Sequence, residues 1–395
     1  MKHDAPRALA FLEGALRRLD EGGLLRRRPP PSTGAGLVFC SNDYLGLATR
    51  ASAERRPEAH SSDTDDSRVR NAPHGTPLGA GASRLISGER EEHIALERSL
   101  SDWLGTAQAL VFSSGYAANV GLLSSLIGSS DLVLSDALNH ASLIDGARLS
   151  RAEVAVYPHL DVEAVRRGLA KARGRRAWVV TESYFSMDAD SPDFEALRLA
   201  CDDAGAGLIV DEAHALGVLG PEGRGVCAQA GVIPDALVGT LGKAFGASGA
   251  FVAGCEELVE WLWNRARSFV FSTGMSPVVA EGARSRLEVC RRDTELRERA
   301  LARALELRAG MRRLGIEPRG YGVIVPWVVG DAKAALRLAE DLRQQGIFVQ
   351  AIRPPTVPEG TSRLRLTATA RHSSADIELA LAAIAKSWDP RASSS

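Results

Sequence analysis

The chain of 395 residues carries 48 Lys and Arg against 49 Asp and Glu, and 45 % of its residues are hydrophobic. This length suits about two or three domains, and the composition is typical of a folded globular protein rather than a disordered one. The formal net charge of −1 gives no reason to expect nucleic acid or a membrane as a partner.

The five cysteines are scattered along the chain and lack the close pairs of zinc and redox motifs, so no metal site is expected. An odd number of scattered cysteines suits a reducing compartment. The first residues are polar and lack the apolar core of a signal peptide, and no run approaches the roughly 18 apolar residues of a membrane span. These features predict a cytoplasmic protein.

The first expected element is an amphipathic helix over residues 7–21, in which leucines recur at helical spacing. A glycine pair ends it, and a run of prolines at 29–31 prevents it from resuming. We expect residues 1–45 to form an N-terminal helical arm. The polar stretch over 51–77 is expected to be an exposed connection.

Between residues 90 and 253, short apolar runs alternate with helical patterns, as in an α/β domain with a mostly parallel sheet. We expect this large domain to span 46–280. The apolar runs are 109–112, 132–134, 154–157, 178–180, 208–210, 236–238 and 250–252, and helical patterns cover 91–104, 161–172 and 193–204.

The Arg-, Glu- and Leu-rich stretch over 281–314 predicts one long helix. After it, strand patterns near 323–329 and 363–368 accompany helical patterns near 332–345 and 375–387. Residues 281–395 are therefore expected to form a smaller α+β C-terminal domain.

Ligands of an open parallel sheet bind beyond the carboxyl ends of its strands, so the residues after each apolar run are candidates. A Ser-Gly turn at 114–115 exposes backbone N–H groups that suit an anion. Asp211 and His214 directly follow another run, and a buried ionised Asp needs a cation. Lys243 lies among small and apolar residues and suits a Schiff base. Each feature alone also has an ordinary structural explanation.

Together, a Schiff-base lysine, an acid for a pyridinium nitrogen and an anion-binding turn are what pyridoxal 5'-phosphate requires. Two further strand ends fit the same cofactor. His140 is suited to lie against one face of the ring, and Ser186 is suited to donate to the phenolic oxygen. The residues thus predict an enzyme with this cofactor.

Six motifs in this order resemble the α-oxoamine synthases: Ser-Asn-Asp-Tyr-Leu-Gly at 41–46, Ser-Gly-Tyr-Ala-Ala-Asn at 114–119, Asn-His-Ala-Ser at 139–142, Phe-Ser-Met-Asp at 185–188, Asp-Glu-Ala-His at 211–214 and Thr-Leu-Gly-Lys-Ala-Phe-Gly at 240–246. The resemblance implies fold type I of the pyridoxal phosphate transferases, which is similar to aspartate aminotransferase. A mostly parallel central sheet flanked by helices is then expected beside the smaller C-terminal domain. Members of this family condense an amino acid with an acyl thioester and lose carbon dioxide.

The segments at 25–28, 351–360 and 363–366 resemble the family members that serve biotin synthesis. The resemblance implies L-alanine and a pimeloyl thioester, on CoA or acyl carrier protein, as substrates. Members of the 2-amino-3-ketobutyrate CoA ligase and serine palmitoyltransferase types stay open, as does a non-catalytic regulatory subunit of the same fold.

The resemblance also implies roles for single residues in a homodimer with shared active sites. Catalysis is expected from Lys243, which bonds to the cofactor aldehyde, from Asp211, which faces the ring nitrogen, and from His140, which stacks on the ring. His140 either positions a carboxylate or acts as an acid. The other expected cofactor-binding residues are Gly115, Tyr116, Ser186, His214, Thr240 and Thr273, with Ser272 and Thr273 reaching the partner's phosphate. Substrate is expected to meet Arg26, Asn42, His140, Arg353 and Thr356.

Overall fold

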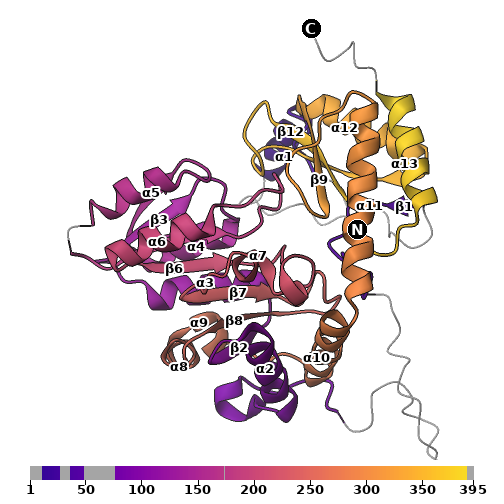
Figure 1. The fold of residues 1–395 in the computed structure, drawn as a ribbon. Coiled ribbons are helices and arrows are strands. Elements are labelled where there is room, and N and C mark those ends of the chain that lie inside the picture. Colours follow the sequence, from indigo (N-terminus) through magenta and orange to yellow (C-terminus); the bar gives the residue numbers. More distant parts are fainter. Residues whose placement is uncertain (1–10, 27–35, 49–75, 173, 389–395) are drawn as a thin grey trace, which may run out of the picture. The chain divides into compact units, whose positions relative to one another are not determined.

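The computed structural model describes residues 11–26, 36–48, 76–172 and 174–388. These residues group into two compact units (Figure 1). The large unit comprises residues 42–302 and 369–371, and the small unit comprises residues up to 41, 303–368 and those from 372 onward. The domain boundaries expected from the sequence, at residues 45 and 280, remain a prediction.

A seven-stranded sheet in the order β2-β8-β7-β6-β5-β3-β4 forms the centre of the large unit. Only β8 runs against its neighbours β2 and β7, while the remaining pairs are parallel. All seven apolar runs named in the sequence analysis are strands. Their β-branched and apolar side chains suit a buried sheet, although β4, at the edge of the sheet, is largely exposed. The strands are β2 (Gln108–Phe112), β3 (Leu132–Asp136), β4 (Glu153–Tyr157), β5 (Ala177–Glu182), β6 (Gly207–Asp211), β7 (Ala236–Thr240) and β8 (Ala250–Gly254).

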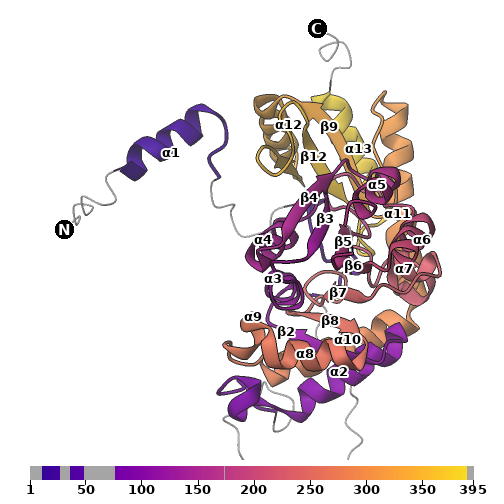
Figure 2. The same ribbon diagram turned by 90° about the vertical axis from the view of Figure 1, so that its left-hand side faces the viewer.

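Helices cover both faces of this sheet, and Figure 2 shows α3 and α4 on one face with α6 and α7 on the other. Leu122, Val180 and Ile209 belong to the buried core of this unit. The helices of the large unit are η2 (Arg84–Gly88, a π-helix), α2 (Glu91–Leu104), α3 (Gly115–Leu126), α4 (Ala141–Ser150), α5 (Val162–Leu169), α6 (Phe194–Ala204), η3 (Pro221–Gly223, a 3₁₀ helix), α7 (Gly225–Gln229), α8 (Glu256–Arg265), α9 (Arg267–Val270) and α10 (Pro277–Arg292). Helix α11 (Thr294–Arg313) begins in the large unit and continues into the small unit.

The expectation of one continuous helix over 281–314 is wrong. Helix α10 ends at Arg292 and α11 begins at Thr294. Between them, Asp293 has φ −94° and ψ 82°, which is not helical. Its carboxylate accepts a hydrogen bond of 3.2 Å from the backbone N–H of Leu296. Asp293 thus caps a new helix, a break that the helix-forming composition around it conceals.

The small unit is an α+β structure, as the sequence predicted for its C-terminal part. A three-stranded antiparallel sheet has the order β11-β12-β9, and β1 pairs with β10 in parallel. Residues 7–10 of the expected N-terminal helix and nearly all of the expected connection at 51–77 lie outside the described residues. The elements are α1 (Phe11–Glu21), β1 (Leu37–Val38), β9 (Ile324–Gly330), α12 (Ala332–Gln344), β10 (Ile347–Phe348), β11 (Gln350–Ile352), β12 (Ser362–Thr367) and α13 (Ser374–Ser387).

Within the described part of the chain, no helix combines the length and the apolar character that a membrane crossing requires.

Candidate active site

One edge of the large sheet gathers the side chains predicted to do chemistry. Strands β3, β5, β6 and β7 run in the same direction, so their carboxyl ends meet at this edge. Asp136, Glu182, Asp211 and Thr240 are the last residues of these strands. The register pairs Glu182 directly with Asp211. We call this edge the active-site edge.

A chain of hydrogen bonds joins Asp211 to His140 through two side chains of neighbouring helices. The amide of Asn119 in α3 donates to Asp211 Oδ2 at 2.7 Å and to Ser142 Oγ at 2.9 Å. Ser142 Oγ in turn lies 2.7 Å from His140 Nδ1. Asp211 Oδ1 accepts from the backbone N–H of Ala213 at 2.9 Å. Each carboxylate oxygen has two lone pairs, so Asp211 keeps acceptor capacity for a ligand N–H.

His140 caps the N-terminus of α4, where its Nδ1 accepts from the backbone N–H of Ser142 at 3.2 Å. Because Nδ1 accepts, the neutral ring carries its proton on Nε2. Partial removal from water lowers the pKa of His140, Asp211 opposes that effect, and Lys243 adds to it. The lowered pKa favours the neutral form of the ring.

Glu182 is a second carboxyl group at the active-site edge and is almost fully buried. Burial, reinforced by the nearby Asp211 charge, raises the pKa of Glu182 to about 8, although Lys243 acts in the opposite direction. A neutral Glu182 does not compete with Asp211 for a cationic ligand group.

His214 and Ser186 are both buried in the large unit. His214 Nδ1 lies 2.7 Å from the hydroxyl of Tyr44, which donates to Asn42 Oδ1 at 3.2 Å. The structure thus brings together Asn42 and His214, which are far apart in sequence. Ser186 lies in the segment after β5, between Phe185 and Met187.

Lys243 follows β7 in a tight loop and is half-buried. The Thr240 hydroxyl donates to the carbonyl of Gly249 at 3.1 Å and accepts from the N–H of Gly242 at 3.2 Å. These bonds close the loop that presents Lys243. Its charge acts on both His140 and Glu182, which places the amine among the groups of the active-site edge.

Helix α3 begins at Gly115, directly after β2, as the anion-binding turn requires. Ser114 is its N-cap, and Ser114 Oγ accepts from the N–H of Ala117 at 3.1 Å. The Tyr116 ring is half exposed, and its hydroxyl donates to Asp145 Oδ2 at 2.5 Å. The N–H groups of this first turn and the helix dipole suit a phosphate.

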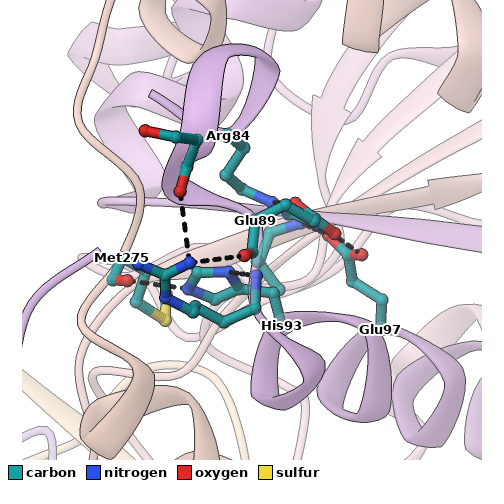
Figure 3. A network of polar contacts seen from close by, with 8 residues as sticks. Arg84, Glu89, His93, Glu97 and Met275 are labelled. Carbon is teal, nitrogen blue, oxygen red and sulfur yellow. Dashed lines mark hydrogen bonds and ion pairs between the residues drawn. The ribbon is translucent and has the colours of Figure 1, made fainter. Parts of the chain in front are cut away.

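Ser272 and Thr273 lie between α9 and α10, in a segment held by a polar network (Figure 3). The fully buried His93 donates from Nε2 to the carbonyl of Met275 at 2.7 Å. The N–H of Gly274 donates to the carbonyl of Ala82 at 3.0 Å. Gly274 and Met275 are thereby fixed to α2 and to the segment that precedes it.

The same segment is anchored by Arg84, whose guanidinium pairs with two carboxylates (Figure 3). Arg84 Nη2 lies 2.8 Å from Glu89 Oε1 and 2.9 Å from Glu97 Oε2. Burial alone would lower the pKa of Arg84, but the hydrogen bonds to both carboxylates more than offset this, so the pKa is raised. The ring of Trp263 lies 5.1 Å from the guanidinium.

Three of the expected substrate-binding residues form a second cluster, in the small unit. Arg26 Nη2 donates to Thr356 Oγ1 at 3.0 Å, and Arg353 donates to the carbonyl of Gly23. Burial, together with the like charge of Arg26, lowers the pKa of Arg353. These residues line a cavity of about 190 Å³, and none of the described residues that line it is acidic. Two neighbouring guanidinium groups suit a carboxylate.

The donor set at the active-site edge fits pyridoxal phosphate. Lys243 supplies an amine, Asp211 retains acceptor capacity for a ring N–H, and the start of α3 offers N–H groups to a phosphate. Sequence reasoning did not single out Asn119, Ser142, Tyr44 or Glu182. Asn119, Ser142 and Tyr44 belong to motifs quoted above, so their polar side chains could have indicated a role in the site. Glu182 could have been recognised as a carboxyl group at the end of a buried strand.

A family model for aminotransferase class I and II matches residues 35–384, and the chain belongs to this family. Among curated relatives, the 8-amino-7-oxononanoate synthase of Anaeromyxobacter dehalogenans strain 2CP-1 is 45 % identical, over 96 % of this chain and 95 % of its own. The protein of the same name from Geobacter sulfurreducens is also 45 % identical, over 95 % of this chain and 97 % of its own.

Solved structures of two related enzymes share the fold. Serine palmitoyltransferase from S. paucimobilis superposes with a TM-score of 0.84 at 27 % identity and covers 99 % of both chains. An 8-amino-7-oxononanoate synthase from Francisella tularensis gives a TM-score of 0.71 at 25 % identity, over 89 % of this chain and 97 % of its own. The expected fold, a type I pyridoxal phosphate enzyme with a mostly parallel sheet flanked by helices, is confirmed.

Proposed function

We propose that this chain is a pyridoxal 5'-phosphate enzyme with 8-amino-7-oxononanoate synthase activity. It condenses L-alanine with a pimeloyl thioester, releasing the thiol and carbon dioxide, as a step of biotin synthesis. The observation that carries the proposal is the grouping of Lys243, Asp211 and His140 at one sheet edge. Identity of 45 % to synthases of this name along nearly the whole chain supports the choice of substrates.

When bound, the cofactor accepts electrons from the α-carbon of an amino acid. Lys243 would hold the cofactor at its aldehyde carbon, and the free amine of Lys243 would remove the α-proton of alanine. Asp211 would accept a hydrogen bond from the ring N–H and keep the ring nitrogen protonated. Asn119 fixes the Asp211 carboxylate through its 2.7 Å bond.

The remaining residues of the active-site edge orient the cofactor. His140 would lie against one ring face, either positioning a carboxylate or acting as an acid from Nε2. Ser186 and His214 would bind the phenolic oxygen. The Tyr44 hydroxyl lies 2.7 Å from His214 Nδ1 and holds the His214 ring in place. Gly115, Tyr116 and Thr240 line the cofactor pocket and its phosphate end.

The cluster in the small unit binds the acidic ends of the substrates. Arg353 takes the carboxylate of alanine, with Thr356 beside it, and Arg26 meets the acyl substrate. The absence of an acidic side chain among the described residues that line the cavity leaves these positive charges available to an anion. Asn42 completes the substrate-binding set beside Tyr44.

The active enzyme is a homodimer in which Ser272 and Thr273 contact the partner's cofactor phosphate. Large apolar side chains near these residues support this arrangement: Leu78 is 79 %, Ile86 80 % and Phe271 72 % exposed in the single chain. The segments of Leu78 and Phe271 are joined by the hydrogen bond of 2.6 Å from Ser276 Oγ to the carbonyl of Leu78. Exposed apolar side chains of this size are typical of an interface.

The reaction takes place in the cytoplasm. All five cysteines lie in the described part of the chain and are free thiols, which suits a reducing compartment.

A substrate panel tests the proposed activity. The purified protein with added cofactor is given alanine, glycine or serine, each with pimeloyl or palmitoyl thioesters on CoA and on acyl carrier protein. Mass spectrometry is expected to find 8-amino-7-oxononanoate with alanine and a pimeloyl donor, and little product otherwise. Product from serine and palmitoyl-CoA would instead identify a serine palmitoyltransferase, which the structural similarity keeps as the second candidate. No product from any pair would favour a non-catalytic subunit.

A further inference from the structure

His159 lies between two carboxylates just after β4 and has no role in the proposed chemistry. Its Nδ1 is 2.8 Å from Asp136 Oδ1, and its Nε2 is 3.2 Å from Asp190 Oδ1. The His159 side chain is 21 % exposed, Asp136 is fully buried, and Asp190 is 32 % exposed. Carboxylates accept hydrogen bonds, so both ring nitrogens donate and the imidazole carries a positive charge.

The two carboxylates belong to different segments of the active-site edge. Asp136 ends β3 and begins the turn to His140, and its Oδ1 accepts the N–H of Leu138 at 2.8 Å. Asp190 closes the segment that contains Ser186, since its carbonyl accepts the N–H of Phe185 at 2.9 Å. His159 therefore joins the segment of His140 to the segment of Ser186.

The surroundings of the ring support this link. Phe185 meets it edge-on, with ring centroids 4.4 Å apart and an angle of 88° between the planes. Burial alone would lower the pKa of His159, but the hydrogen bonds to Asp136 and Asp190 raise it to about 9. Asp136 and Asp190 are the two charged groups that act on the ring. Tyr157, at the end of β4, is buried beside Asp136, and burial raises its pKa.

We propose that His159 is a positioning residue whose two hydrogen bonds fix the segment carrying Ser186 against the segment carrying His140. This role rests on the proposed function, because it is at the cofactor that the two segments must keep their spacing. Without the link, residues 183–190 open more often, and the cofactor binds more weakly.

Three variants test the proposal. His159→Gln removes the positive charge, and Asp190→Asn removes the negative charge from the tether to residues 183–190 while leaving the buried pair with Asp136 intact. The matched control is Arg176→Gln, which breaks a pair with Asp131 at 3.0 and 3.1 Å. Arg176 and Asp131 directly precede β5 and β3, so this pair ties the same two strands at their opposite ends.

Hydrogen exchange of the full-length protein without added substrate is the first readout. Backbone amides of residues 183–190 are expected to exchange about three- to thirty-fold faster in His159→Gln and Asp190→Asn at pH 7, and at the wild-type rate in Arg176→Gln. Above pH 9 the ratio of the exchange rate in His159→Gln to that in the wild type is expected to fall toward one, because the His159 ring of the wild type loses its charge there.

The second readout is the dissociation constant for pyridoxal phosphate, measured by titration into the cofactor-free protein. It is expected to rise by a similar factor in His159→Gln and Asp190→Asn, and to stay at the wild-type value in Arg176→Gln. Unchanged exchange and affinity in both variants would overturn the proposal, as would equal changes in all three proteins. If His159→Gln does not fold, Asp190→Asn decides. Neither readout requires turnover, so failure of the proposed activity is distinguishable from failure of this inference.

Discussion

At the scale of single residues, the active-site edge depends on buried polar groups that hold one another in place. Asn119 uses both amide protons, one for Asp211 and one for Ser142, and Ser142 passes the link to His140. These hydrogen bonds give the buried side chains defined positions. The arrangement leaves Asp211 as an oriented carboxylate and His140 as a neutral ring.

Asp211→Asn is expected to lower kcat with alanine and pimeloyl-CoA at least about a hundredfold, because an amide cannot balance a protonated ring nitrogen. Steady-state kinetics measures the loss, and circular dichroism checks that the fold survives. Asp235→Asn is the control: it alters a carboxylate paired with Arg198 at 2.8 Å, away from the active-site edge, and should keep wild-type kcat. Wild-type turnover by Asp211→Asn would contradict its assignment.

Glu182 gives a pH dependence of stability. Its pKa rises from 4.5 to about 8 in the folded chain because of burial and Asp211, so the folded state binds more protons than the unfolded state between these values. The free energy of unfolding must then fall as pH rises through this window. Denaturant titrations of cofactor-free protein at several pH values are expected to show a shallower fall for Glu182→Gln. Parallel curves for the two proteins would refute a protonated Glu182.

At the scale of elements, much of the fold could be predicted from sequence and some of it could not. The strands of the large sheet were predictable because each is a short apolar run, and the polar residues after β6 and β7 indicated a site. The short strands β1, β10 and β11 of the small unit were not predicted. The break at Asp293 was not, because one capping residue interrupts an otherwise helical composition. The roles of Asn119 and Ser142 depend on how closely α3 and α4 pack beside β6, which sequence spacing does not specify.

The start of α3 gives a prediction at this scale. Ser114→Ala removes an N-cap bond of 3.1 Å and is expected to lower the free energy of unfolding by about 1 kcal/mol. It should also weaken pyridoxal phosphate binding, because the first turn of α3 meets the phosphate. Ser373→Ala, which removes the N-cap of α13, should destabilise the protein similarly without affecting cofactor affinity. Equal cofactor affinity in both variants would place the phosphate elsewhere.

At the scale of the whole molecule, the proposed shared sites make activity depend on association. Ile86→Asp places a charge on an apolar side chain that is 80 % exposed in the single chain and is expected to shift the protein toward monomers with reduced activity. Sedimentation velocity and turnover are measured on the same samples. Leu379→Asp, at an exposed leucine of α13, should leave both unchanged. A fully active monomer would exclude sites shared between subunits.

The most direct test of the account is to identify the residue that bonds to the cofactor. The purified protein with pyridoxal phosphate is treated with borohydride, which makes an imine bond permanent, and its peptides are then analysed by mass spectrometry. The account predicts one pyridoxyl adduct, on Lys243, that is lost in Lys243→Ala but kept in Lys171→Ala, which alters an exposed lysine. An adduct on another lysine, or no adduct in a folded protein saturated with cofactor, would contradict it.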